Sequence, residues 1–216
     1  VYLDAVFAPA ILENPNIFYQ EGWHIEEDEA GTLSYKGVVF NEMKGAMSSP
    51  DELADYKLFE LLFPDTCYGF NSGGDPAVIP TLSYEQFKET YRRFYHPSNA
   101  RIFLDGDVPI DETLALIESY LSKFGKSDNL PVITMQTRKS ASATQYFELA
   151  ADEELTDQSR LTAGRIFCGW EERTKLIAAR ILLDVVCGSN ETPVKRAVLS
   201  AELAQELDIS VDDSAA

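Results

Sequence analysis

Residues 35–52 read YKGVVFNEMKGAMSSPDE and contain one helix and the start of the next. If the first helix begins near Gly37, residues four apart share a face. One stripe is then apolar except for a single carboxylate, and its members are Val38, Glu42 and Ala46, flanked by Val39 and Met43. We therefore expect Glu42 to face inward, where burying a charge costs several kcal/mol unless it is paired or bound to a metal. An internal salt bridge, a metal ion, or a helix that exposes this stripe would each account for the pattern.

The whole chain has the composition of a folded protein with an acidic surface. Of its 216 residues, 45% are hydrophobic and 11% are aromatic, which is enough to bury a core. Lys and Arg total 18 against 36 for Asp and Glu, which gives a formal charge of -18. Such a charge repels nucleic acid and anionic membranes, so we expect neither as a partner. It would attract cationic peptides, although solubility alone also explains it.

The cysteines indicate the redox compartment of the protein, and the first residues indicate whether the chain is part of a longer one. Cys67, Cys168 and Cys187 are odd in number and lack paired spacing, which favours a reducing compartment over a disulfide framework. No apolar run approaches the roughly 20 residues of a membrane span, and no signal peptide is visible. The first residues, VYLDAVFAP, resemble the middle of an amphipathic helix. We expect the chain to be an internal piece of a longer protein.

The pattern over the first half predicts an α+β fold, an antiparallel sheet with helices packed on one face. Three helix starts carry cap signals, at Asn14, Ser49 and Ser83. Helices are expected over 2–7, from Pro15, from Gly37, from Pro50, from Tyr84 and from Asp111, with strands within 23–36, turned at Ala30-Gly31, and over 101–104.

The second half divides at a polar stretch, residues 125–143, which we expect to be a linker between units 1–124 and 144–216. Beyond it, 144–150 and 159–170 are expected as strands of a new unit. A helix within 171–191 is nearly apolar all round, so we expect it to be well buried, with Gly188 as its C-cap. A shorter helix follows, with apolar residues at Val194, Ala197, Val198 and Ala201.

Few residues of the chain could perform catalysis. A catalytic zinc takes three protein ligands, and the only histidines are His24 and His96. The stretch HIEED, from His24, differs from the H-x-x-E-H zinc motif by having Asp28 in place of the second His, and it falls on a predicted strand. His96 precedes Pro97 at a predicted turn. The stretch NSGGDP, residues 71–76, lacks a P-loop Lys and is more typical of a plain loop. The chain by itself is therefore not expected to build a zinc site.

The order of several segments carries a resemblance to a known family. These are YLDAVF, NPNIFYQEGWH, YKGVVFNEMKGA, YGFNSGGDPAVIPTLSYEQF and YHPSNARIFLDGD, followed by ILLDVVCGSNETPVKRAVL. Together they resemble the pitrilysin/insulinase zinc metallopeptidases, in the presequence-protease and falcilysin branch. The likeness is dense over 1–107 and looser over 145–210.

The resemblance implies a site and a domain order. It implies that Glu42 is the third zinc ligand, in the segment VVFNEMKG, and that an H-x-x-E-H helix upstream of Val1 supplies two His ligands and the general-base Glu. It makes 1–124 the C-terminal part of a catalytic-type domain and 144–216 the start of a second, non-catalytic repeat domain. The family's substrate-anchoring Arg and Tyr belong to its C-terminal half. This piece is then expected to be inactive without the remainder of the same polypeptide.

Two functions follow from the resemblance. The first is a zinc endopeptidase that degrades unfolded peptides inside a closed chamber, in the cytoplasm of bacteria or the matrix of an organelle. The second is a family member whose zinc site has decayed and which serves as a structural or peptide-binding module. An intact H-x-x-E-H upstream of Val1 would favour the enzyme.

Overall fold

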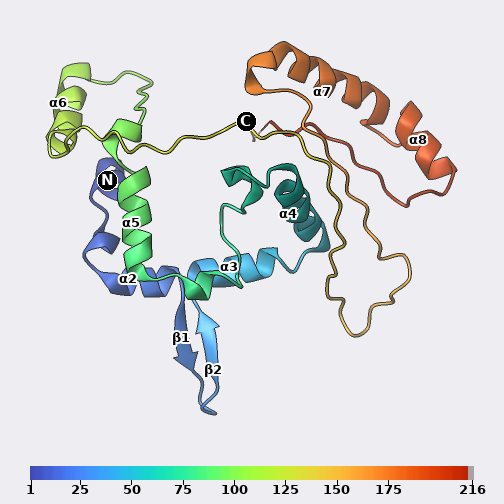
Figure 1. The fold of residues 1–216 in the computed structure, drawn as a ribbon, viewed down its shortest axis with the longest axis horizontal. Coiled ribbons are helices and arrows are strands. Elements are labelled where there is room, and N and C mark those ends of the chain that lie inside the picture. The colour runs from blue at the N-terminus through green and yellow to red at the C-terminus, as the bar shows by residue number, and fades with distance from the viewer. Residues whose placement is uncertain (214–216) are drawn as a thin grey trace.

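The computed structural model describes residues 1–213, and its helices and strands follow one another along an extended path (Figure 1). The elements are α1 (Tyr2–Phe7), α2 (Pro15–Glu21), β1 (His24–Glu27), β2 (Leu33–Lys36), α3 (Val38–Ala46), α4 (Pro50–Leu62), α5 (Tyr84–Phe94), α6 (Ile110–Leu121), α7 (Arg173–Cys187) and α8 (Pro193–Ser200). Short 3-10 turns join several of them.

The helix starts lie where the cap residues predict them. The Asn14 side chain accepts a hydrogen bond from the Asn16 N–H at 3.1 Å, ahead of α2. Ser49 accepts from the Glu52 N–H at 3.4 Å, and Pro50 opens α4. Ser83 and Gln86 form the expected capping box of α5. Each cap satisfies backbone donors that the first turn of a helix leaves unpaired.

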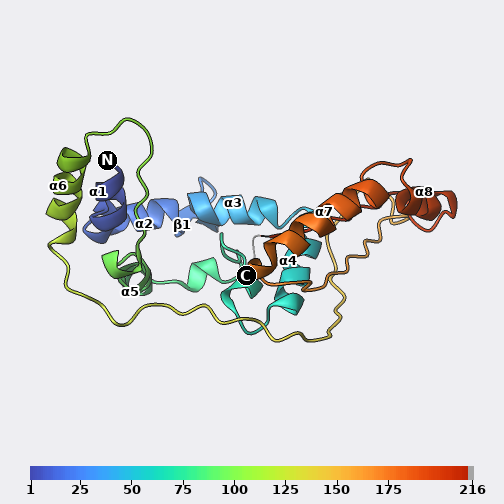
Figure 2. The same cartoon turned by 90° about the horizontal axis from the view of Figure 1, so that it is seen from above.

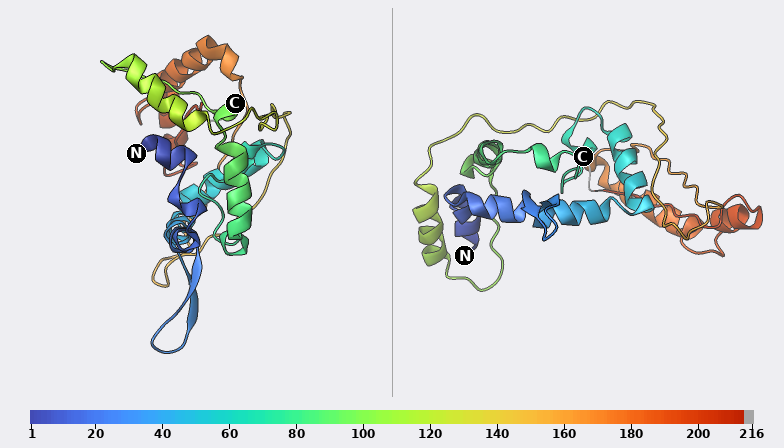
Figure 3. Two further views of the ribbon diagram at one scale, coloured as in Figure 1. Left: turned by 90° about the vertical axis from the view of Figure 1, so that its left-hand side faces the viewer. Right: turned by 90° about the horizontal axis from the view of Figure 1, so that it is seen from below.

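The two predicted strands form an antiparallel hairpin. His24 pairs with Lys36 and Glu27 with Leu33. The turn is held by the Asp28 carboxylate, which accepts from the backbone N–H of Ala30 and Thr32 at 2.9 and 2.8 Å. The hairpin projects away from the helices in Figure 1 and in the left view of Figure 3. The α+β class is thus confirmed. The expected antiparallel sheet with helices packed on one face is not found, because the only sheet within residues 1–213 is this two-stranded hairpin.

The best-packed part of the chain surrounds α3. Its buried side chains are Phe40 and Met43, which contact Ile79 and are flanked by Trp23, Val39 and Ala46. Gly37, the N-cap of α3, has φ 144°, a conformation that L side chains rarely adopt, and a Cβ at this position would overlap the Gly22 carbonyl oxygen. This close approach fixes the direction in which α3 leaves the hairpin.

Three predicted strands and one predicted burial are wrong. Residues 101–104, 144–150 and 159–170 form no strand, because a strand needs a hydrogen-bonded neighbour and the described residues pair only β1 with β2. The long helix α7 forms and ends at Gly188 as predicted, but it is not well buried. Its apolar residues Ile181, Leu182 and Val185 are about three-fifths exposed.

The accessible surface is far larger than that of a compact protein of this size. It measures 16565 Å², whereas a compact monomer of 24.1 kDa exposes about 10,000 Å². Seen from above, α1 and α6 lie at one end and α8 at the other, with extended chain between (Figure 2). Residues 125–169 contain no helix or strand, and the division into 1–124, 125–143 and 144–216 stays a prediction. Across residues 1–213, no helix combines the length and the apolar character that a membrane crossing requires.

Candidate functional site

The Glu42 side chain is exposed, so the prediction that it faces inward is wrong. The buried face of α3 is defined by Phe40 and Met43, three residues apart, and not by the stripe through Val38. Val38 is itself 44% exposed. Because successive helical residues are about 100° apart, Glu42 falls beside the buried face and not at its centre. The cost of burying a charge therefore gives no argument for a metal at Glu42.

The backbone that carries Glu42 is nevertheless held firmly in place. The backbone of α3 is held by the burial of Phe40 and Met43 and by the Phe40 N–H, which donates to the Gly22 carbonyl at 3.3 Å. Within residues 1–213, no hydrogen bond or ion pair is recorded on the Glu42 side chain. An exposed, ionisable oxygen pair on an anchored helix can accept a ligand without first breaking an internal contact.

The two histidines serve the local fold. His24 donates from Nδ1 to the Tyr19 carbonyl at 2.8 Å, next to the hairpin. His96 accepts at Nδ1 from the Ser98 N–H at 3.1 Å and so caps a turn, as predicted. Neither lies with Glu42 in a cluster, and the described part of the chain contains no group of three His, Cys, Asp or Glu side chains that could hold a metal. By itself, this part of the chain does not fit a zinc ion.

The glycine-rich loop, residues 71–76, supports α3. Asn71 accepts from the Gly73 N–H and donates to the Gly74 carbonyl, both at 3.2 Å, which closes the loop on itself. A Cβ on Gly73 would overlap the sulfur of Met43. The segment forms a loop, as predicted, and this loop also packs against the core around α3. Sequence reasoning missed this role of Gly73, although two adjacent glycines signal a close backbone approach.

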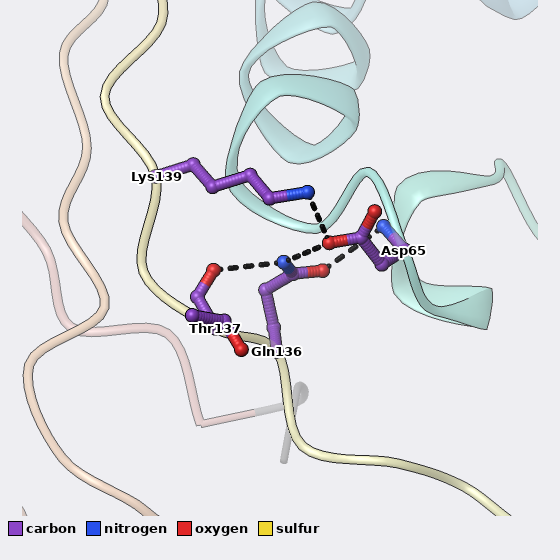
Figure 4. A network of polar contacts seen from close by, with 4 residues as sticks. All are labelled: Asp65, Gln136, Thr137 and Lys139. Atoms are coloured by element: carbon purple, nitrogen blue, oxygen red, sulfur yellow. Dashed lines mark hydrogen bonds and ion pairs between the residues drawn. The ribbon is translucent and has the colours of Figure 1, made fainter.

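The stretch without helix or strand, residues 125–169, contacts α4 near both of its ends. Beyond its C-terminus, Asp65 Oδ2 accepts from Lys139 Nζ at 2.5 Å and from Gln136 Nε2 at 2.8 Å (Figure 4). The Asp65 N–H donates back to Gln136 Oε1 at 3.0 Å. At the first turn of α4, Asp51 pairs with Arg160 at 3.0 Å.

The contacts at Asp65 affect its titration. The hydrogen bond from Lys139, followed by that from Gln136, lowers the pKa of Asp65 below its ordinary value of 3.8.

A cavity of about 620 Å³ lies between α4 and residues 143–162. Gly164 crosses α4 where a Cβ would come within 3.0 Å of Leu58 and Leu62.

Comparison with known proteins gives one family and a consistent set of relatives. A family model described as the peptidase M16 inactive domain matches residues 81–215, a range that includes the predicted linker. Protein HypA of Clostridium perfringens is 37% identical over 218 aligned positions, which cover 99% of this chain and 22% of that protein.

Several further relatives carry the name presequence protease. Presequence protease 1, chloroplastic/mitochondrial, of Arabidopsis thaliana is 49% identical over 128 positions, 59% of this chain and 12% of that protein. The mitochondrial presequence protease of Xenopus laevis is 36% identical over 214 positions, 95% of this chain and 21% of that protein. The chain thus spans about a fifth of the length of the relatives that match nearly all of it.

Proposed function

Since the chain belongs to the M16 peptidase family, we propose that it forms part of a zinc-dependent endopeptidase that degrades unfolded peptides. The predicted resemblance is confirmed at the level of this family and its presequence proteases. In the proposal, the chain contributes Glu42 as one metal ligand. The other ligands and the general base lie on another part of the polypeptide.

One observation carries this assignment: the Glu42 carboxylate is exposed, on an anchored helix, and has no recorded partner among residues 1–213. A carboxylate that joins ligands from other segments at a metal needs a fixed backbone and an oxygen that is free to bind. The helix α3 meets both conditions, because Phe40 and Met43 fix its backbone while Glu42 stays in solvent.

The chain's own contribution is to hold and orient this carboxylate. When bound, zinc supplies a Lewis acid and an activated water to peptide hydrolysis. Three protein ligands are usual at such a site, and Glu42 is one. The piece alone is therefore proposed to be inactive.

The acidic balance of the chain supports a peptide substrate with basic residues. A formal charge of -18 on 216 residues creates a field that raises the local concentration of cationic peptides. We propose that these peptides are unfolded and are enclosed within a chamber completed by the remainder of the same polypeptide. Affinity for basic peptides should then fall as salt is raised.

The test uses a full-length protein that carries this chain. Glu42→Gln removes the charge but keeps the size, and Glu89→Gln on α5 is the matched control, because Glu89 is also exposed and helical. The proposal expects Glu42→Gln to lose most peptide hydrolysis while the far-UV spectrum is unchanged, and Glu89→Gln to keep it. Full hydrolysis by Glu42→Gln would remove Glu42 from the ligand set.

A second function is favoured by the description of the matching family model. Residues 81–215 match a domain named as inactive, which supports a structural or peptide-binding module without catalysis. The two functions differ in the full-length protein. A module would bind a basic peptide and leave it intact whether or not zinc is added, whereas the enzyme would cleave it and lose this activity to a chelator.

A further inference from the structure

A small aromatic cavity, whose lining does not include Glu42, lies where α1 and the end of α5 meet the end of α6. Its volume is about 330 Å³. Its walls come from four separate stretches of chain, and they are Phe7 at the end of α1, Leu12 after it, Tyr91, Arg92, Tyr95 and His96 at the end of α5, and Phe124 after α6. Nothing in the proposed function uses this cavity.

The walls are fixed by ring contacts and hydrogen bonds. The Phe124 ring packs against Phe7 at 6.0 Å and meets His96 edge-on at 5.6 Å between centroids. Tyr91 and Tyr95 stack at 4.9 Å with nearly parallel rings. The Tyr91 hydroxyl donates to the Val6 carbonyl, which ties α5 to α1. The cavity is therefore a property of the folded chain and not of one mobile side chain.

The lining combines this apolar body with one cation. Arg92 is the single formally charged residue of the described lining, and no carboxylate is recorded as its partner within residues 1–213. His96 accepts a backbone N–H at Nδ1, so its neutral ring keeps the proton on Nε2 and can donate there. A guanidinium and an imidazole N–H beside aromatic rings offer donors and no acidic acceptor.

We propose that this cavity binds the terminal carboxylate of an apolar amino-acid residue, with the aromatic walls around its side chain and Arg92 on the carboxylate. The volume is at the small end of ligand pockets, which suits one residue and not a long segment. A cationic ligand is disfavoured, because Arg92 would repel it. A wholly apolar ligand would leave the guanidinium without a counterion.

The adjacent residue Arg93 provides a matched control. It lies over the Phe94 ring, 5.4 Å from the centroid, and is not part of the lining. Arg92→Gln and Arg93→Gln therefore make the same change in net charge at neighbouring positions of one helix. Only the first removes a group from the cavity.

The experiment titrates the full 216-residue chain, labelled with 15N, with N-acetyl-phenylalanine and with the neutral N-acetyl-phenylalanine amide. We expect shifts at residues 91–96 and an affinity for the carboxylate about fivefold higher than for the amide, the scale of a solvent-exposed ion pair. Arg92→Gln should abolish this preference, and Arg93→Gln should keep it. Phe124→Ala should weaken both ligands.

Three results would overturn the proposal. They are the absence of shifts at residues 91–96, equal affinity for the acid and the amide, and an equal loss of preference in both arginine variants. The last would show a general charge effect. None of these outcomes touches Glu42, so the proposed function is tested separately.

Discussion

Met43 packs its sulfur against Gly73, leaving no space for a Cβ at that position. The contact joins the centre of α3 to a loop thirty residues further along the chain. Together with Ile79 it determines which face of α3 is buried. The outward position of Glu42 is a consequence of that choice, because Met43 and Glu42 are neighbours on one helix and cannot both lie at the centre of its buried face.

Gly73→Ala should lower the free energy of unfolding by about 1–3 kcal/mol, because the added methyl group must displace Met43. Gly45→Ala is the control, since nothing lies within 4 Å of its Cβ position. That change should raise stability by about 0.5 kcal/mol, as expected for Gly to Ala in a helix. Urea unfolding followed by circular dichroism measures both. Equal effects of the two substitutions would mean that Gly73 and Met43 do not pack as described.

The buried face of α3 can be tested directly with two truncations. Phe40→Ala should cost about 3 kcal/mol, because Phe40 is buried and contacts Met43 and Ile79. Val38→Ala should cost less than about 0.5 kcal/mol, because Val38 is largely in solvent. The reverse order in urea unfolding would restore the stripe that the sequence suggested and place Glu42 inside.

The sequence predicts the local structure of the first half well, because its signals are local. Asn14, Ser49 and Ser83 each bond to a backbone N–H two or three residues away, so their caps can be recognised without the fold. The choice of buried face on α3 is different. Both Val38 and Phe40 are apolar, and only a distant loop decides between them, so periodicity alone selected the wrong stripe.

The predicted strands beyond residue 100 fail for a related reason. An alternating apolar pattern describes a segment that suits a sheet, but the strand forms only when another segment hydrogen-bonds to it. Residues 144–150 contain the apolar and aromatic side chains that suit a strand, yet they form no strand because no segment of residues 1–213 pairs with them. The same holds for α7, whose apolar surface indicates burial that residues 1–213 do not provide.

The Asp65 contact makes a prediction about pH. Because Lys139 and Gln136 lower the pKa of Asp65, the folded carboxylate binds a proton more weakly than the unfolded one. Its stabilising contribution is complete above the unfolded value of 3.8 and is lost as the pH falls through the lower folded value. An NMR titration of the Asp65 carboxyl carbon should give a midpoint below 3.8, and Lys139→Ala should raise it. A midpoint at or above 3.8 that Lys139→Ala leaves unchanged would contradict the contact.

The exposed face of α7 should make the 216-residue chain self-associate. Ile177, Ile181 and Val185 repeat every four residues and are all at least 47% exposed, which forms an apolar stripe. Sedimentation velocity should show an apparent mass that rises with concentration. Ile181→Lys should reduce this rise, whereas Arg173→Lys on the same helix should not. A monomer at all concentrations, with no difference between the two variants, would mean that the stripe is covered in solution.

The zinc affinity of a full-length protein carrying this chain tests the central claim most directly. Competition with a chelating dye gives the dissociation constant for the protein and for its Glu42→Gln and Glu89→Gln variants. If Glu42 is a ligand, Glu42→Gln weakens zinc binding at least tenfold, since a charged ligand is replaced by a neutral amide, and Glu89→Gln binds as the parent does. Equal zinc affinity for all three proteins would contradict the account.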